Sequence, residues 1–87
     1  DIMTTFQIDN NQVVVFLENN ETYTPATGTV QKLNLKALKN SQMRIKVGGA
    51  TDREILAAAE ETDLIADDTV QFTTFGDAGV ITGFVLN

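Results

Sequence analysis

The stretch that most constrains the fold is residues 43–62, MRIKVGGATDREILAAAEET, because a strand pattern stands directly before a helix pattern in it. Apolar and cationic side chains alternate from Met43 to Val47, which is the period of two expected of a strand with one buried face. Two glycines then allow a tight turn. Thr51 and Glu54 have the spacing of a capping box, in which each side chain bonds an unpaired amide at a helix start. The stretch therefore predicts a strand, a turn and an α-helix at about 51–62.

The other strand patterns lie on either side of turn-forming residues and predict hairpins. A short helix at 35–38 is the alternative to one of these strands, since Lys, Leu and Ala are good helix formers. The last strand is apolar on both of its faces, which predicts cover on both sides and a central place in the sheet. We expect three hairpins, formed by 2–8 with 12–17, by 29–38 with 43–47, and by 70–75 with 80–86.

Together these elements predict an α+β fold with five or six mainly antiparallel β-strands and one α-helix (about 51–62) packed on one face, as a small roll or grasp-like sheet. A chain of 87 residues allows a single domain, 1–87. Tyr23 is expected to fold back onto the core from the loop 21–28, and Gly83 to leave room for a close neighbour. The predicted core consists of Phe6, Val13, Val15, Leu33, Ile45, Val47, Ile55, Phe72, Ile81 and Phe84.

The inventory of reactive side chains argues against an enzyme. The chain contains no cysteine and no histidine, and Ser41 is its only serine. The common nucleophile–base pairs and any imidazole or thiolate metal site are therefore excluded by composition. We predict a non-catalytic protein without metal or cofactor. Asp63, Asp67 and Asp68 are the alternative, as a carboxylate-dependent ion site, although they lack the spacing of a calcium loop.

Charge is segregated along the chain, whose net charge is −6, because every lysine and arginine lies between Lys32 and Arg53. If 31–36 pairs with 42–47 as a hairpin, the alternation places all of the hairpin's cations on one outer face. In the stretch that follows the predicted helix, every charged side chain is a carboxylate. The predicted binding residues are accordingly a basic surface in 32–46, formed by Lys32, Lys36, Arg44 and Lys46, and an acidic surface in 60–68, formed by Glu60, Glu61, Asp67 and Asp68.

Two such surfaces suggest a protein-interaction or assembly module, an accessory or structural component or a small inhibitor, whose partner is another protein or a second copy. The alternative is a nucleic-acid-binding module, since lysine and arginine neutralise phosphates. That alternative is weakened by the lack of an aromatic residue on the basic face and by the acidity of the rest of the chain. No apolar run approaches the roughly 20 residues that span a bilayer, so we expect a soluble protein with no membrane partner, compatible with cytoplasm or a virion.

Overall fold

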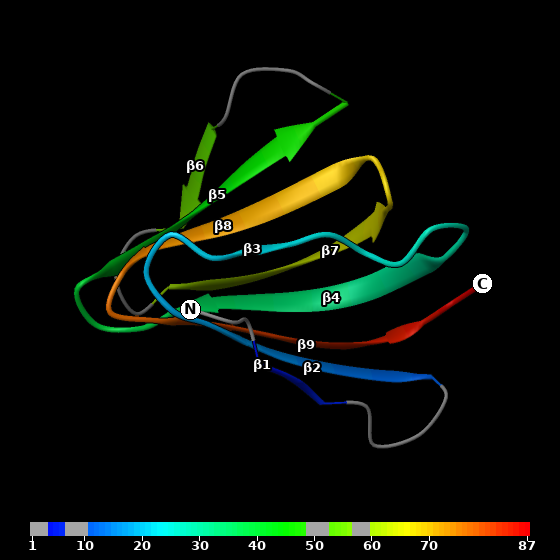
Figure 1. Cartoon of the computed structure of the whole chain (residues 1–87), viewed down its shortest axis with the longest axis horizontal. Helices are drawn as coiled ribbons and strands as arrows, with labels where there is room; N and C mark the ends of the chain where they lie inside the picture. The colour runs from blue at the N-terminus through cyan, green and yellow to red at the C-terminus, as the bar shows by residue number, and fades with distance from the viewer. Residues whose placement is uncertain (1–3, 7–10, 49–52, 57–59) are drawn as a thin grey trace.

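The computed structural model describes residues 4–6, 11–48, 53–56 and 60–87. These residues form nine β-strands and no helix (Figure 1). The strands are β1 (Thr4–Phe6), β2 (Gln12–Leu17), β3 (Thr22–Tyr23), β4 (Val30–Ala37), β5 (Ser41–Val47), β6 (Arg53–Leu56), β7 (Glu61–Asp67), β8 (Val70–Gly76) and β9 (Gly79–Val85).

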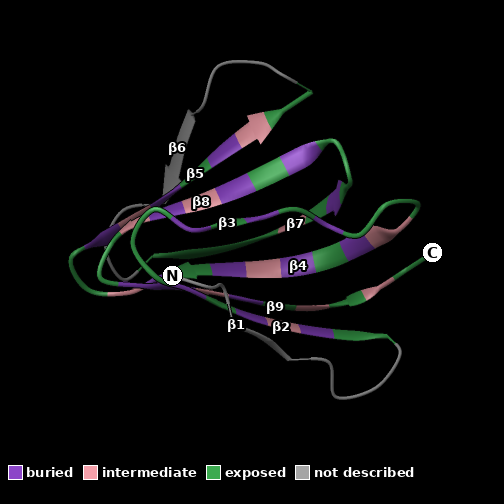
Figure 2. Ribbon diagram, in the orientation of Figure 1, coloured by how far each residue is buried: buried purple, intermediate pink, exposed green. Residues whose placement is uncertain are grey.

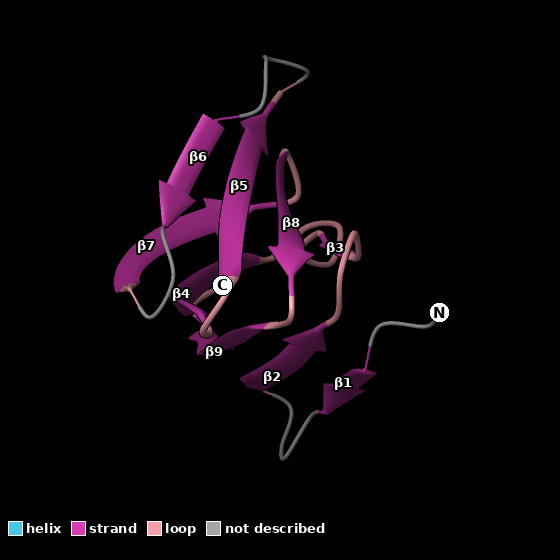
Figure 3. Ribbon diagram, turned by 90° about the vertical axis from the view of Figure 1, so that its left-hand side faces the viewer, coloured by secondary structure: helices cyan, strands magenta, loops and turns pink. Residues whose placement is uncertain are grey.

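The strands form two antiparallel sheets that pack face to face (Figures 1 and 3). One sheet has five strands in the order β1-β2-β9-β4-β7, and the other has four in the order β3-β8-β5-β6. The pairings are nested around the central pair β5–β6: β4 pairs with β7, β3 with β8, and β2 with β9. Two sheets built by such nested antiparallel pairs have the topology of a jelly roll.

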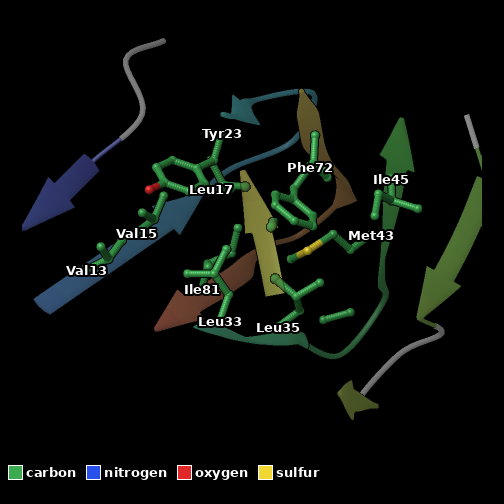
Figure 4. Packing of buried hydrophobic residues seen from close by; sticks show 13 residues of the cluster. Val13, Val15, Leu17, Tyr23, Leu33, Leu35, Met43, Ile45, Phe72 and Ile81 are labelled. Atoms are coloured by element: carbon green, nitrogen blue, oxygen red, sulfur yellow. The ribbon is translucent and has the colours of Figure 1, made fainter. Parts of the chain in front are cut away.

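The core lies between the two sheets, and among the described side chains it takes alternate residues of β2, β4, β5 and β8 together with Tyr23, Ala66 and Ile81 (Figure 4). Along β4, buried and exposed residues alternate, as the bands in Figure 2 show, because successive side chains of a strand point to opposite faces. Burying a large apolar side chain of this kind contributes about 1.5–3 kcal/mol relative to leaving it exposed. The largest fully buried apolar side chains are Phe72, Leu17, Leu33, Leu35, Met43, Ile81 and Val15.

Two expectations about single residues are confirmed. Tyr23 is buried against the core and its Oη donates a hydrogen bond to Oε1 of Gln31 at 2.7 Å. Gly83 lies where β9 runs close to β4, and a Cβ there would overlap the carbonyl oxygen of Lys32. The missing side chain therefore lets the two backbones approach at this point.

The predicted α+β class is wrong, because the segment expected to form the helix is extended wherever the structure describes it. Arg53–Leu56 is strand β6, which pairs with β5 and sets Glu54 opposite Arg44. Residues 61–62 already belong to β7, while 51–52 and 57–59 lie outside the described residues. The helix signals were local, and a helix of about a dozen residues with an alanine-rich stripe is marginal without a large buried face. The pairing of this segment with β5 stabilises the extended conformation more than the capping box and the alanine residues stabilise a helix.

Only the first of the three predicted hairpins is confirmed. β1 and β2 pair antiparallel, but β4 and β5 belong to different sheets, as do β8 and β9. Their connections are crossings between the two sheets, and the crossings bond each other: Leu38 N donates to Ala78 O at 3.0 Å and Ala78 N to Ser41 Oγ at 2.8 Å. These four strands were predicted and their partners were not, because strand alternation carries no information about which strand lies alongside.

The predicted core is also corrected at two residues. Val13, Val15, Leu33, Ile45, Phe72 and Ile81 are buried, whereas the side chains of Val47 and Phe84 are exposed. Val47 is the last residue of β5. Phe84 lies on the outer face of β9. The remaining two core predictions, Phe6 and Ile55, concern side chains outside those described.

Candidate protein-interaction surface

The outer face of the five-stranded sheet, which we call the sheet face, brings together side chains from β2, β9, β4 and β7. Antiparallel register places them in rows that run across the strands. Side chains directly opposite one another on neighbouring strands are close enough to interact. The three rows are Gln12, Phe84, Lys32 and Ile65; Val14, Thr82, Asn34 and Asp63; and Phe16, Val80, Lys36 and Glu61.

The half of the sheet face on β4 and β7 is charged. Lys32 and Lys36 are exposed on β4, and Lys36 lies opposite Glu61 of β7. Between these rows Asn34 Nδ2 donates to Asp63 Oδ1 at 2.7 Å. The predicted basic and acidic surfaces are therefore partly one surface, on which cations of β4 lie beside carboxylates of β7. The pairing of β4 with β7 could have been inferred from their complementary charges, had 61–62 been predicted as strand.

Two of the predicted acidic residues organise the turn after β7. Oδ1 of Asp67 accepts hydrogen bonds from Thr69 Oγ1 at 2.6 Å and Thr69 N at 2.9 Å, and these bonds hold the pKa of Asp67 below its ordinary value. Oδ2 of Asp68 accepts from Gly28 N at 3.1 Å. Glu60 precedes β7, and its carbonyl oxygen accepts from Ala37 N at 3.1 Å. All three side chains are exposed.

The other two predicted cations, Arg44 and Lys46, lie on the opposite side of the molecule. They belong to β5 and alternate with the buried Met43 and Ile45, so their side chains are on the outer face of the four-stranded sheet. Arg44 lies over the ring of Phe75, 5.4 Å from its centroid, and its Nε donates to Gln42 Oε1 at 3.2 Å. The expected cluster of four cations is thus divided between two faces.

The half of the sheet face on β2 and β9 is apolar, and sequence reasoning missed it. Phe84 is 45% exposed and Phe16 is 40% exposed, with Val14 and Val80 half-buried beside them. Leu86, just beyond β9, is 49% exposed, whereas Ile65, 62% exposed, lies apart from this set on β7, with Lys32 of β4 between it and Phe84. The sequence feature that pointed to this surface was the last strand, β9, which is apolar on both of its faces. β9 is central in its sheet, as predicted. However, the apolar side chains on its second face point outward and are not covered.

The space between the sheets holds few polar groups. Glu21 is buried at the start of β3, where its Oε1 accepts from Glu18 N at 2.7 Å. Oε2 of Glu21 and Oγ1 of Thr74 are buried without a hydrogen-bond partner among the described residues. Burial raises the pKa of Tyr23, and the bond to Gln31 lowers it in part. Within the described ranges no three His, Cys, Asp or Glu residues are grouped as a metal site would require.

Comparison with solved structures supports the fold. An RmlC-like cupin protein from Desulfovibrio desulfuricans superposes with a TM-score of 0.60 at 13% identity, over 97% of this chain and 80% of that one. Drosophila melanogaster CENP-C bound to CAL1 gives a TM-score of 0.45 at 9% identity, over 95% and 80% of the two chains. A further CENP-C structure from the same organism gives 0.45 and 9%, over 95% and 72%. The superposition on the RmlC-like cupin protein shows a cupin-like fold for this chain.

No protein-family model matches the chain, and no curated protein sequence matches it. In the described part of the chain there is no helix long and apolar enough to cross a membrane.

Proposed function

We propose that this chain is a non-catalytic protein-interaction module that forms a weak homodimer through the sheet face and serves in assembly. The observation that carries the proposal is the exposed apolar half of that face, centred on Phe84 of β9. Contiguous exposed apolar patches on soluble proteins mark interaction sites more often than scattered single residues do. Phe84 and Phe16 lie on adjacent strands in the first and third cross-strand rows, and Val14 in the middle row and Val80 opposite Phe16 connect them.

The composition of the sheet face favours a second copy as the partner. A second copy can cover the apolar side chains of β9 with the same side chains and can set its own β4 against β2. With a two-fold axis parallel to β9, the middle strand, Phe84 and Val80 lie against their own equivalents. In that arrangement Lys36 lies over Phe16 of the second copy, since both belong to the same cross-strand row.

The size of the face sets the expected affinity. Five strands at about 4.8 Å spacing and about seven residues at 3.4 Å each give a face of roughly 500–600 Å². Two such faces bury about 1,000–1,200 Å², which is at the lower end of specific interfaces. We therefore expect a reversible dimer that forms at high micromolar concentration, with hot spots at the two phenylalanines.

The other two candidate functions have weaker support. Lys32 has an aromatic neighbour, Phe84, but the carboxylates of Glu61, Asp63 and Asp67 share its face and would repel a phosphate backbone. An ion site at 63–68 is not favoured either, because Asp67 and Asp68 are engaged in turns and Asp63 accepts from Asn34.

The proposal is tested by sedimentation equilibrium from low micromolar to millimolar protein. The wild-type protein is expected to pass from monomer to dimer, and Phe84→Thr to weaken the dimer by about tenfold or more, since it removes a buried aromatic from the interface centre. Phe75→Thr is the matched control, because it makes the same change on the outer face of the other sheet. It is expected to leave the equilibrium unchanged.

Either of two results would contradict the proposed dimer. One is a wild-type protein that stays monomeric at millimolar concentration. The other is a dimer that Phe75→Thr disrupts and Phe84→Thr does not.

A further inference from the structure

The edge of the five-stranded sheet at β7 is long and unpaired among the described strands (Figure 3). β7 has seven residues, whereas the other strands at sheet edges, β1, β3 and β6, have three, two and four. A free strand edge is a row of backbone donors and acceptors that can pair with an added strand. β7 therefore offers the longest template for strand addition in the described part of the molecule.

The register shows which backbone groups are free. Ala37 N donates to the carbonyl of Glu60, so these two residues form a hydrogen-bonded pair, and pairs of this kind recur at every second position along β4 and β7. The backbone groups of residues 62, 64 and 66 then point toward β4. Those of Glu61, Asp63 and Ile65 point away from the sheet.

The side chains at these positions select the occupant. Glu61, Asp63 and Asp67 place carboxylates at every free position of the edge except that of Ile65, the most exposed large hydrophobic residue described. Lys32 and Lys36 lie on the far side of β7, on β4, and not beside an incoming strand. A carboxylate directly opposite another carboxylate is destabilising, whereas a cation opposite it is stabilising.

The same charges disfavour a second copy at this edge. An antiparallel pair of two β7 strands that overlaps fully sets Glu61 opposite Asp67 in both directions. Shifting the pair by two residues sets Asp63 opposite Asp63 or Asp67. On its inner side the edge is only partly covered, since Leu64 is half-buried and Thr62 exposed, which leaves room for small apolar or β-branched side chains.

We propose that β7 binds an extended, lysine- or arginine-rich segment of a partner protein as an added antiparallel strand. The segment carries cations opposite Asp67, Asp63 and Glu61 and an apolar residue opposite Ile65. Main-chain bonds supply affinity, and the alternate side chains supply specificity. This inference rests on the free backbone edge of β7, whereas the dimer rests on the side chains of β9 and β2, so loss of peptide binding and loss of the dimer are separate results.

The test uses a fluorescein-labelled peptide, Lys-Thr-Val-Thr-Lys-Thr-Lys, titrated with the full chain at low salt and followed by fluorescence anisotropy. We expect saturable binding that weakens about tenfold when salt is raised toward half molar, because the ion pairs are at the surface. One control peptide has glutamate in place of each lysine. A second control peptide keeps every charge but is N-methylated at its valine and at the second of its three lysines. These changes remove two backbone hydrogen-bond donors. Both are expected not to bind.

Variants of the chain separate charge from backbone pairing. Asp63→Lys is expected to weaken binding about tenfold or more, while Asp77→Lys, the same change in the β8–β9 turn, is expected to leave it within about twofold. Ile65→Pro removes an outward donor without touching the β4 ladder, so it should abolish binding, whereas Ile65→Thr should retain it. A thermal melt of each variant verifies folding.

Any of three results overturns the proposal. The peptide does not bind at millimolar protein, the N-methylated peptide binds as well as its parent, or folded Ile65→Pro binds like the wild-type protein. The last two results would mean that the peptide is held by charge alone.

Discussion

At the scale of single residues, Tyr23 is the clearest polar contributor to stability. Its Oη donates to Oε1 of buried Gln31, and both side chains lie at the core. Tyr23→Phe leaves that acceptor unpaired, so we expect a loss of about 1–2 kcal/mol in the free energy of unfolding. Urea denaturation of the two proteins measures the difference. Thr24→Val, an exposed change one residue away, serves as the control, and an equal loss in it would refute the role assigned to the bond.

The same residue predicts a dependence on pH. Burial raises the pKa of Tyr23 above its ordinary value of 10.0, so the folded state keeps the phenolic proton more tightly than the unfolded state does. The contribution of Tyr23 is therefore full below about pH 10 and is lost as pH rises through its folded pKa. We expect the melting temperature to fall more steeply above pH 10 in the wild-type protein than in Tyr23→Phe. Because Tyr23 is the only tyrosine, its ultraviolet titration reports the shift directly.

Whether the burial of a side chain could be predicted from the sequence differs from residue to residue. The burial of Val13, Val15 and Leu33 followed from alternation, because one face of a strand is covered in either fold. The exposure of Phe84 did not follow, since an aromatic residue on an apolar strand fits a core as well as an uncovered face. The residue that centres the proposed interface was thus assigned to the wrong side of the sheet.

At the scale of elements, β4 and β7 form the pair that joins the predicted basic and acidic residues. Lys36 lies opposite Glu61, and an opposite-charge pair in this position contributes about 0.2–1 kcal/mol. Lys36→Glu is expected to destabilise the monomer by a similar amount, and the exchange of both, Lys36→Glu with Glu61→Lys, to restore most of it. Denaturation at micromolar protein of the wild-type protein, Lys36→Glu, Glu61→Lys and the double exchange measures the coupling. If the exchange is no better than the single variant, the two residues do not interact.

The elements also show where local reasoning reached its limit. The strands β2, β4, β5, β8 and β9 were all predicted, from alternating apolar residues as in β5, from apolar runs as in β9, and from the turn-forming residues between them. The helix at 51–62 was predicted from a capping-box spacing and alanine content, which describe an isolated segment. The structure instead pairs 53–56 with β5, a contact between residues that no local pattern encodes. Partner choice, and with it the division of the four cations, depends on the global topology.

At the scale of the whole molecule, the nested strand pairing brings together charges of opposite sign that are far apart in the sequence. Basic residues of the middle segment and acidic residues of the C-terminal half meet on β4 and β7, while Arg44 and Lys46 are carried to the other sheet. The interior is apolar apart from a few groups, and the sheet face carries the exposed aromatic residues.

The central claim is that two copies meet through the sheet face with β9 in the middle. Because the chain has no cysteine, Gln12→Cys introduces a single site for a nitroxide at the margin of that face. Spin-labelled unenriched copies are mixed with ¹⁵N-labelled wild-type chains at a concentration where dimers form. We predict the strongest broadening for amide signals from β9, β4 and β2 in the ¹⁵N-labelled copy, and weaker broadening for Thr73 and Lys46, because the sheet that carries them lies about 10 Å farther from the interface. Broadening centred on the four-stranded sheet, or none in a solution that contains dimers, would contradict the account.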